Sequence, residues 1–165
     1  MNIIVARGMN GEIGANNELM WKLPTDMKFF MDMTVGNTVV MGRNTRESLG
    51  EKPLPNRLNI VISRGASTLV SNYGNVKYMR MDTFRWWIEN YYSKNTHGEV
   101  FIIGGKMLYE EFANSSKVMY ITDIAKTFEI ADTVVHLDTE GMIKTPIYKG
   151  MENGLDFEIN RWERK

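Results

Sequence analysis

Asp26 has the most unusual sequence surroundings of any acidic residue in the chain. Pro24 interrupts the preceding segment and Thr25 is a candidate N-cap, so a helix is expected over residues 25–33. On that helix Asp26 shares one face with apolar residues, namely Met27, Phe30, Met31 and Met33. A carboxylate on such a face needs a bound donor or cation, or a shifted pKa, and both indicate function. The alternative is that Asp26 only favours the positive end of the helix dipole.

Three of the expected strands are followed by residues suited to binding phosphate. Residues 42–45 open a helix after one strand, Ser63 and Arg64 follow another, and Gly104 and Gly105 open a helix after a third. Because helix N-termini present unpaired N–H groups and a positive dipole, two such starts with two arginines suit a doubly phosphorylated ligand. For the glycine pair alone, a tight strand-to-helix turn is the alternative. The sequence has no G-x-G-x-x-G motif, so a standard dinucleotide-binding fold is not supported.

Two loops also suggest ligand binding. Residues 9–20 are rich in Gly and Asn and form a long connection, which is typical of a mobile lid; an ordinary surface turn is the alternative. Arg57 ends a loop that Pro53 and Pro55 stiffen, so the direction of its side chain is restricted. A planar guanidinium binds a carboxylate through two parallel hydrogen bonds, and Arg57 is therefore a candidate for that contact.

Composition limits the classes of function. The chain has 165 residues with 43% hydrophobic and 24% charged residues, which fits a single globular domain over residues 1–165. Lys+Arg and Asp+Glu both number 20, so no global charge recruits nucleic acid or a membrane surface. With no cysteine and only His97 and His136, no metal site and no disulfide are expected. We expect a cytoplasmic protein that works as a monomer.

Alternation of strand and helix patterns predicts an α/β fold. The expected strands cover residues 3–6, 38–41, 59–62, 76–79, 100–103, 118–121, 133–137 and 155–161. The expected helices cover residues 25–33, 43–49, 82–92 and 105–113. The alternation favours a central eight-stranded, mostly parallel sheet with about four flanking helices, and the strand-rich end favours an antiparallel C-terminal edge.

Several motifs together resemble the dihydrofolate reductase family, in the family's order and spacing and over essentially the whole chain. They are Trp21-x-Leu23-Pro24-x-Asp26, Val40-Met41-Gly42-Arg43-x-Thr45-x-Glu47-Ser48, Pro53-Leu54-Pro55-x-Arg57-x-Asn59, Ile103-Gly104-Gly105 and Phe157-Glu158-Ile159. The resemblance implies a dihydrofolate reductase-like fold and the NADPH-dependent reduction of 7,8-dihydrofolate to tetrahydrofolate. Hydride would pass to pterin C6 while N5 gains a proton. Asp26 would orient the pterin and stabilise positive charge on it, and Trp21 would help to hold a water near the ring.

The resemblance also assigns binding residues. Arg57 would hold the α-carboxylate of the substrate's glutamate tail. The other implied substrate contacts are Ile4, Val5, Ala6, Met27, Phe30, Leu49, Leu54, Ile103 and Thr122. The implied NADPH contacts are Ala6, Ile13, Gly14, Asn17, Leu19, Gly42, Arg43, Asn44, Thr45, Leu49, Ile62, Ser63, Arg64, Ile103, Gly104, Gly105, Lys106, Met107, Leu108 and Tyr109. For the aliphatic members, plain core packing is the alternative.

Three residues depart from the family pattern, and two other functions compete. Met20 replaces a common proline before the tryptophan, Arg46 replaces a usual aromatic residue, and Met31 stands where some members carry a basic residue. The competing functions are a related pterin or pyrimidine reductase acting on a riboflavin precursor, and a nucleotide-binding module without catalysis. The pairing of Asp26 with Arg57 disfavours the first, since its substrate carries a phosphate instead of a glutamate tail. Intact Asp26, Trp21 and Thr122 disfavour the second.

Overall fold

Six parallel strands form the middle of the main sheet, in the order β8-β1-β7-β3-β4-β6. The computed structural model describes residues 1–66, 69–70, 74–90 and 98–165. The six strands are β1 (Asn2–Arg7), β3 (Thr38–Gly42), β4 (Leu58–Ile62), β6 (Val76–Met79), β7 (Val100–Gly104) and β8 (Val118–Ile124). Their short, β-branched, apolar sequences are those expected of strands that are covered on both faces.

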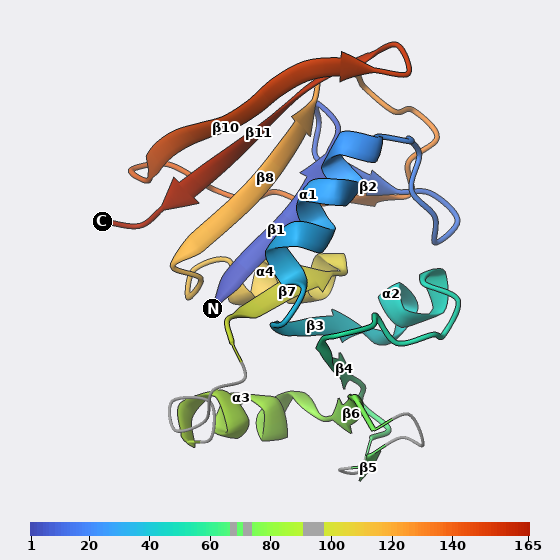
Figure 1. Cartoon of the computed structure of the whole chain (residues 1–165), viewed down its shortest axis with the longest axis vertical. Helices are drawn as coiled ribbons and strands as arrows, with labels where there is room; N and C mark the ends of the chain where they lie inside the picture. The colour runs from blue at the N-terminus through green and yellow to red at the C-terminus, as the bar shows by residue number, and fades with distance from the viewer. Residues whose placement is uncertain (67–68, 71–73, 91–97) are drawn as a thin grey trace.

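Antiparallel strands complete the sheet at both edges (Figure 1). At the C-terminal edge they are β11 (Leu155–Glu163), which pairs with β8, and β10 (Ile143–Glu152), which pairs with β11. With the six parallel strands they give the predicted number of eight, but β10 stands in place of the strand expected over residues 133–137, and β5 (Leu69–Val70) adds a short ninth strand beside β6. The mostly parallel sheet with an antiparallel C-terminal edge is thus confirmed.

The strand expected over residues 133–137 does not join this sheet, so that prediction is wrong in length and place. Within this range only Thr133–Val134 form a strand, β9. It pairs with β2 (Glu12–Gly14) in a separate two-stranded sheet. Its neighbours Val135 and Leu137 are buried in the main core, which explains their apolar character without a strand.

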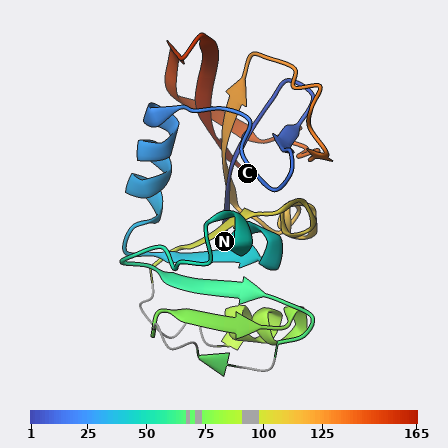
Figure 2. The same ribbon diagram turned by 90° about the vertical axis from the view of Figure 1, so that its right-hand side faces the viewer.

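Four helices flank the sheet: α1 (Pro24–Thr34), α2 (Arg43–Ser48), α3 (Met81–Asn90) and α4 (Lys106–Phe112). Figure 2 shows α1 on one face, with α3 and α4 on the other. All four match expected helices within two residues at their described ends; residues 91–92 of the expected third helix lie outside the described residues. Among the described helices, none is long and apolar enough to cross a membrane.

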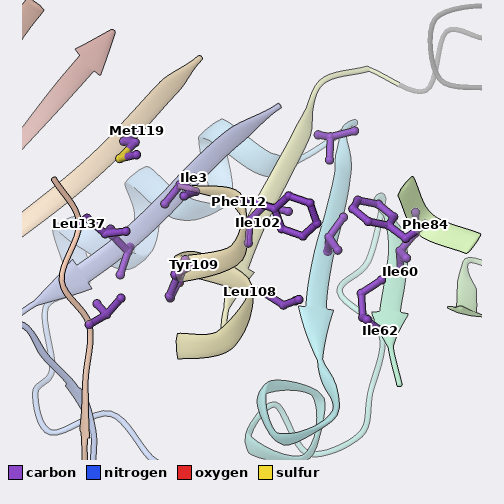
Figure 3. Packing of buried hydrophobic residues seen from close by; sticks show 14 of the residues in the cluster. Ile3, Ile60, Ile62, Phe84, Ile102, Leu108, Tyr109, Phe112, Met119 and Leu137 are labelled. Atoms are coloured by element: carbon purple, nitrogen blue, oxygen red, sulfur yellow. The ribbon is translucent and has the colours of Figure 1, made fainter. Parts of the chain in front are cut away.

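The largest core cluster lies between the sheet and the helices α3 and α4 (Figure 3). Phe84 from α3 and Phe112 from α4 meet edge to face, with ring centroids 5.6 Å apart. Alternate residues of the parallel strands point into the same cluster, including Ile3, Ile60 and Ile102, all of which are fully buried. This packing stabilises the sheet and leaves its opposite face available for α1 and the cleft described next.

Candidate active site

A cleft of about 1840 Å³ lies beyond the carboxyl ends of the parallel strands. Residues at or just after the ends of β1, β3, β4 and β7 line it, among them Ala6, Gly42, Ser63 and Gly104. α1 supplies a further wall through Asp26, Met27, Phe29, Phe30 and Met31. In open α/β sheets this is the usual place for a ligand, because strand ends and helix starts meet there.

Asp26 is hydrogen-bonded to a residue of strand β8. The Oγ1 atom of Thr122 donates a hydrogen bond of 2.5 Å to Oδ1 of Asp26, although the two residues are 96 positions apart. Burial raises the pKa of the Asp26 carboxyl, the bond from Thr122 opposes that rise, and the negative charge of Glu152 adds to it. The buried Tyr109 also interacts with this charge: burial and Asp26 both raise the pKa of its phenol, whose Oη donates to the Ile4 carbonyl at 3.0 Å. An acid with a raised pKa in a cleft is a typical feature of a functional site.

Thr25 does not cap α1, so that prediction is wrong. The helix begins at Pro24, Leu23 occupies the N-cap position, and no side chain of the local sequence caps it. Instead both the N–H and the hydroxyl of Thr25 bind the carboxylate of Glu152, at 2.9 and 2.5 Å. A residue 127 positions away therefore does what a local N-cap would do.

Arg57 is held rigidly at the other end of α1. Its Nη1 donates to Oγ1 of Thr34 and its Nε to the carbonyl of Pro55, both at 2.9 Å, and only 5% of the residue is exposed. Asn59 fixes the loop by bonding both the N–H and the carbonyl of Leu54. Burial lowers the pKa of the Arg57 guanidinium, which remains a cation at neutral pH. The loop thus presents a fixed positive group.

The opposite part of the cleft is built from two helix starts. Glycines hold the N-cap positions of α2 and α4, Gly42 and Gly105, and neither helix has a side-chain cap. Gly104, whose peptide bond to Gly105 is cis, has φ +135°, and a Cβ there would lie 2.9 Å from Oγ1 of Thr45. Only glycine fits at this position, since both the backbone angle and the neighbouring hydroxyl exclude a side chain.

Two exposed arginines border this part of the cleft, Arg43 and Arg64. The side chain of Arg43 is 76% exposed and its Nε lies 3.1 Å from Oε1 of Glu47, one helical turn away. A pair this exposed is weak, so Arg43 can turn to another anion at little cost.

Residues 9–20 contain β2 and are tied to the segment around β9. Glu12 is 3% exposed, and its carboxylate accepts hydrogen bonds from the N–H groups of Asn10 and Phe128 at 2.8 and 3.1 Å. Further along, Asp132 accepts a bond from the N–H of Asn16 at 2.7 Å and donates its own N–H to Gly14 at 3.0 Å. These contacts hold the loop beside the cleft; that it moves as a lid stays a prediction.

Nearly all residues that the sequence singles out line this one cleft. The two exceptions are Arg57, which is buried and does not line the cleft, and Trp21, which packs in a separate cluster with its ring centroid 5.2 Å from that of Phe128. Sequence reasoning missed several lining residues, namely Glu18, Phe29, Glu47, Ser48, Gly65, Met81, Glu110, Glu111, Asp132 and Thr133. Helical periodicity from Asp26 could have indicated Phe29, whereas nothing local marks Asp132.

The three residues that depart from the family pattern lie in different surroundings. Arg46 is buried in α2, where its guanidinium stacks 5.5 Å from the ring centre of Tyr78 and its Nη2 donates to the carbonyl of Glu51 at 2.8 Å. It thus packs where an aromatic residue would pack. Met31 is 46% exposed at the edge of the cleft, and Met20 is half-buried against the cluster that contains Trp21. Among the described residues, no group of three or more side chains could hold a metal ion; His97 lies outside them.

Comparison with known proteins identifies the family. Residues 1–164 match the family model for dihydrofolate reductase. The chain belongs to the dihydrofolate reductase family. Its reaction is therefore the reduction of dihydrofolate to tetrahydrofolate, and the riboflavin-precursor alternative is set aside.

Individual members of the dihydrofolate reductase family resemble the chain in both sequence and structure. The dihydrofolate reductase of Staphylococcus aureus strain MSSA476 is 40% identical over 128 residues, which cover 78% of this chain and 73% of that protein. The bifunctional dihydrofolate reductase-thymidylate synthase of Paramecium tetraurelia is 38% identical over 110 residues, 67% of this chain and 22% of that protein. The structure of the Enterococcus faecalis dihydrofolate reductase, complexed with NADP(H) and RAB-propyl, superposes with a TM-score of 0.82 at 30% identity, covering 99% of this chain and 95% of that one.

Proposed function

We propose that the pterin ring of dihydrofolate binds between α1 and β1, with Asp26 as the group that orients it. The observation that carries this proposal is the hydrogen bond from Thr122, which fixes the Asp26 carboxylate within an otherwise apolar wall of the cleft. An ionised carboxylate there accepts hydrogen bonds from the pterin's amino group and ring nitrogen. Its charge favours the ring that has gained a proton at N5, and so lowers the barrier to reduction.

The residues around Gly104 fit NADPH. The cleft is long enough to pass from Asp26 to Arg64, and the glycines at both helix starts leave room for the backbone to approach a pyrophosphate. Arg43 and Arg64, with Ser63 beside them, supply the cations and the hydroxyl that a 2′-phosphate requires. When bound, NADPH supplies the hydride that reduces pterin C6.

The chain's own residues position the reactants and exclude water. Ile4, Ile103 and Phe30 form apolar walls against the reacting rings, while Ile13 and Leu19 from the lid would cover them. We propose that a water near Trp21 delivers the proton to N5, so that Asp26 need not touch that atom. Trp21 would act by limiting where that water can lie.

Arg57 would bind the glutamate tail. Its Nη1 and Nε already hold Thr34 and Pro55, which sets the plane of the guanidinium before the substrate arrives. Preorganisation of this kind reduces the entropy lost on binding. The apolar side chains Met27, Leu49 and Leu54, which line the cleft, would contact the aminobenzoyl group between pterin and tail.

One assay tests the proposal. Consumption of NADPH with dihydrofolate as the sole acceptor should be rapid with the wild type and severely reduced with Asp26→Asn. Consumption that is equal in the two proteins would remove Asp26 from the proposed role. No consumption by the wild type would favour the alternative of a nucleotide-binding module without catalysis. We also propose that residues 1–165 act as one domain, as a monomer and in the cytoplasm, where both small molecules are dissolved.

A further inference from the structure

Helix α1 borders a hollow and therefore has little packing along its inner face. Thr34 is the only buried residue among its eleven, and Met27 and Met31 are 50% and 46% exposed. Hydrophobic burial normally holds a helix of this length on its sheet. Here the main apolar contact is that of the half-buried Phe29, whose ring centroid lies 6.0 Å from that of Tyr120, and polar contacts near the two ends of α1 add to it.

At the C-terminal end Arg57 binds Thr34, as described above. At the N-terminal end the contact comes from Glu152, the last residue of β10. Its Oε1 accepts the N–H of Thr25 at 2.9 Å and its Oε2 accepts the hydroxyl of Thr25 at 2.5 Å. The carboxylate is thus placed against the positive end of α1, where a negative charge is stabilised.

The turn between β10 and β11 sets the direction of Glu152. Asn153 and Gly154 both have positive φ, 50° and 75°, which fits a tight two-residue hairpin turn, and Glu152 forms the last pair with Leu155. Asn153 adds a bond from its Nδ2 to the carbonyl of Lys22 at 2.7 Å. Along the rest of β10 the residues are exposed, except Gly150, which is half-buried like Glu152. The tip of the hairpin is therefore the part that contacts α1.

We propose that Glu152 is a positioning residue of the dihydrofolate site: it holds the first turn of α1 so that Asp26 points at the pterin. The inference rests on the proposed role of Asp26. Two neighbouring residues of one helical turn are each fixed from a different strand, Thr25 by Glu152 from β10 and Asp26 by Thr122 from β8. Loss of the first contact frees the turn, while the second still ties the carboxylate to the sheet.

Glu152 also acts on Asp26 through its charge. The titratable groups of the described chain that interact with Asp26 are Glu152 from β10 and Tyr109 from α4, and Thr122 supplies the hydrogen bond. Burial is the larger cause of the raised pKa of Asp26, and the repulsion from the negative charge of Glu152 is the other cause that raises it. The position and the charge of Glu152 can be separated, because glutamine keeps an acceptor for Thr25 but carries no charge.

Three variants test the proposal in the full chain without ligands: Glu152→Gln, Glu152→Ala and the control Glu158→Gln. Glu158 lies on the same hairpin and pairs with Lys144 at 3.7 Å, so the control makes the same chemical change away from α1. Carbon NMR should find that Asp26 titrates at lower pH in Glu152→Gln and as in the wild type in the control. Amide exchange of Met27, which donates to Leu23 at 3.0 Å, should become about three- to thirtyfold faster in Glu152→Ala, since an N-cap is lost.

In turnover assays Glu152→Ala should raise KM for dihydrofolate by a larger factor than it lowers kcat, and Glu152→Gln should restore KM. Wild-type exchange of the Met27 amide in Glu152→Ala would overturn the proposal. If Glu152→Ala does not fold, the same exchange measurement in Thr25→Val, which removes the hydroxyl that Glu152 binds, decides instead. Both readouts are taken without substrate, so a failed role for Asp26 would appear separately, as a rate of hydride transfer in Asp26→Asn equal to that of the wild type.

Discussion

The hydroxyl of Thr122 and the carboxylate of Asp26 are joined by a hydrogen bond of 2.5 Å between strand β8 and helix α1. This bond crosses the cleft wall and fixes one oxygen of the acid. Burial nevertheless dominates its environment, so the pKa of Asp26 is raised. The hydrogen bond from Thr122 and the burial of the carboxyl act on Asp26 in opposite directions, so its replacement should affect both catalysis and the pH dependence of stability.

Asp26→Asn should depress hydride transfer strongly at neutral pH while leaving the fold intact. The amide can still hydrogen-bond but cannot stabilise a protonated pterin, and loss of one such electrostatic contact costs about 3–4 kcal/mol, or roughly two to three powers of ten in rate. Activity should partly recover as the pH falls, because solvent then protonates the substrate. Stopped-flow measurements across the pH range check this, and a rate equal to the wild type at every pH would contradict it.

The same substitution should change the pH dependence of stability. The raised pKa means that the folded chain holds the Asp26 proton more tightly than the unfolded chain does. That contribution to stability is complete below the unfolded pKa of about 3.9 and is lost as the pH rises through the folded pKa. Urea unfolding at several pH values should therefore find Asp26→Asn gaining stability relative to the wild type as the pH rises. A difference that does not vary with pH would show that Asp26 titrates alike in both states.

Arg57→Leu should raise KM for dihydrofolate far more than it lowers kcat. The tail is remote from the ring and is bound equally in the ground and transition states, so a charge-assisted contact of about 1.5–3 kcal/mol corresponds to roughly ten- to a hundredfold. Thr34→Val, which removes the partner of Nη1, should produce a smaller effect in the same direction. A pterin without the glutamate tail serves as the control substrate, and equal losses with it would make Arg57 purely structural.

Replacing Arg43 and Arg64 together with Ala should remove most of the preference for NADPH over NADH. Each contact with the 2′-phosphate contributes about 1.5–3 kcal/mol, so the double variant should lose roughly two to four orders of magnitude of selectivity. The loss should appear in the affinity for NADPH and shrink at high salt, because both arginines are exposed. Lys149→Ala, on the distant strand β10, is the matched control for loss of a surface cation. A double variant with wild-type selectivity would place phosphate recognition elsewhere.

Local patterns were sufficient for the parallel strands, which are short apolar runs, and for α1, α3 and α4, which carry apolar residues at helical spacing. Helix α2 contains no apolar residue and was expected from its place directly after a strand. Local patterns were insufficient for β10, whose residues from Ile143 to Lys149 are all exposed and which contains Pro146. A strand that buries neither face has no alternation to detect. Likewise, Thr25 fits the pattern of an N-cap, and nothing near it indicates that Glu152 caps the helix from the end of a distant hairpin.

Which residues line the cleft could largely be predicted, but the contacts among them could not. Motif spacing and family resemblance indicated which residues gather at the strand ends, and nearly all of them line one cleft. The partners of Arg57 and Asp26 follow from tertiary contacts, with Thr34 and Thr122 respectively, whereas Glu47 is a local partner of Arg43 on the same helix. Thr122 was expected as a substrate contact, whereas its bond to the acid depends on the placement of α1 against β8.

Strand β10 also bears on how the chain behaves at high concentration. An open sheet edge of ten residues would ordinarily offer its free backbone groups to a second molecule and so begin aggregation. Here the register shifts between Pro146 and Tyr148, the proline has no N–H to donate, and Lys144 and Lys149 add charge along the strand. These features make the outer edge a poor template for intermolecular strand addition, even though four large apolar side chains, Ile143, Ile147, Tyr148 and Met151, lie exposed on it.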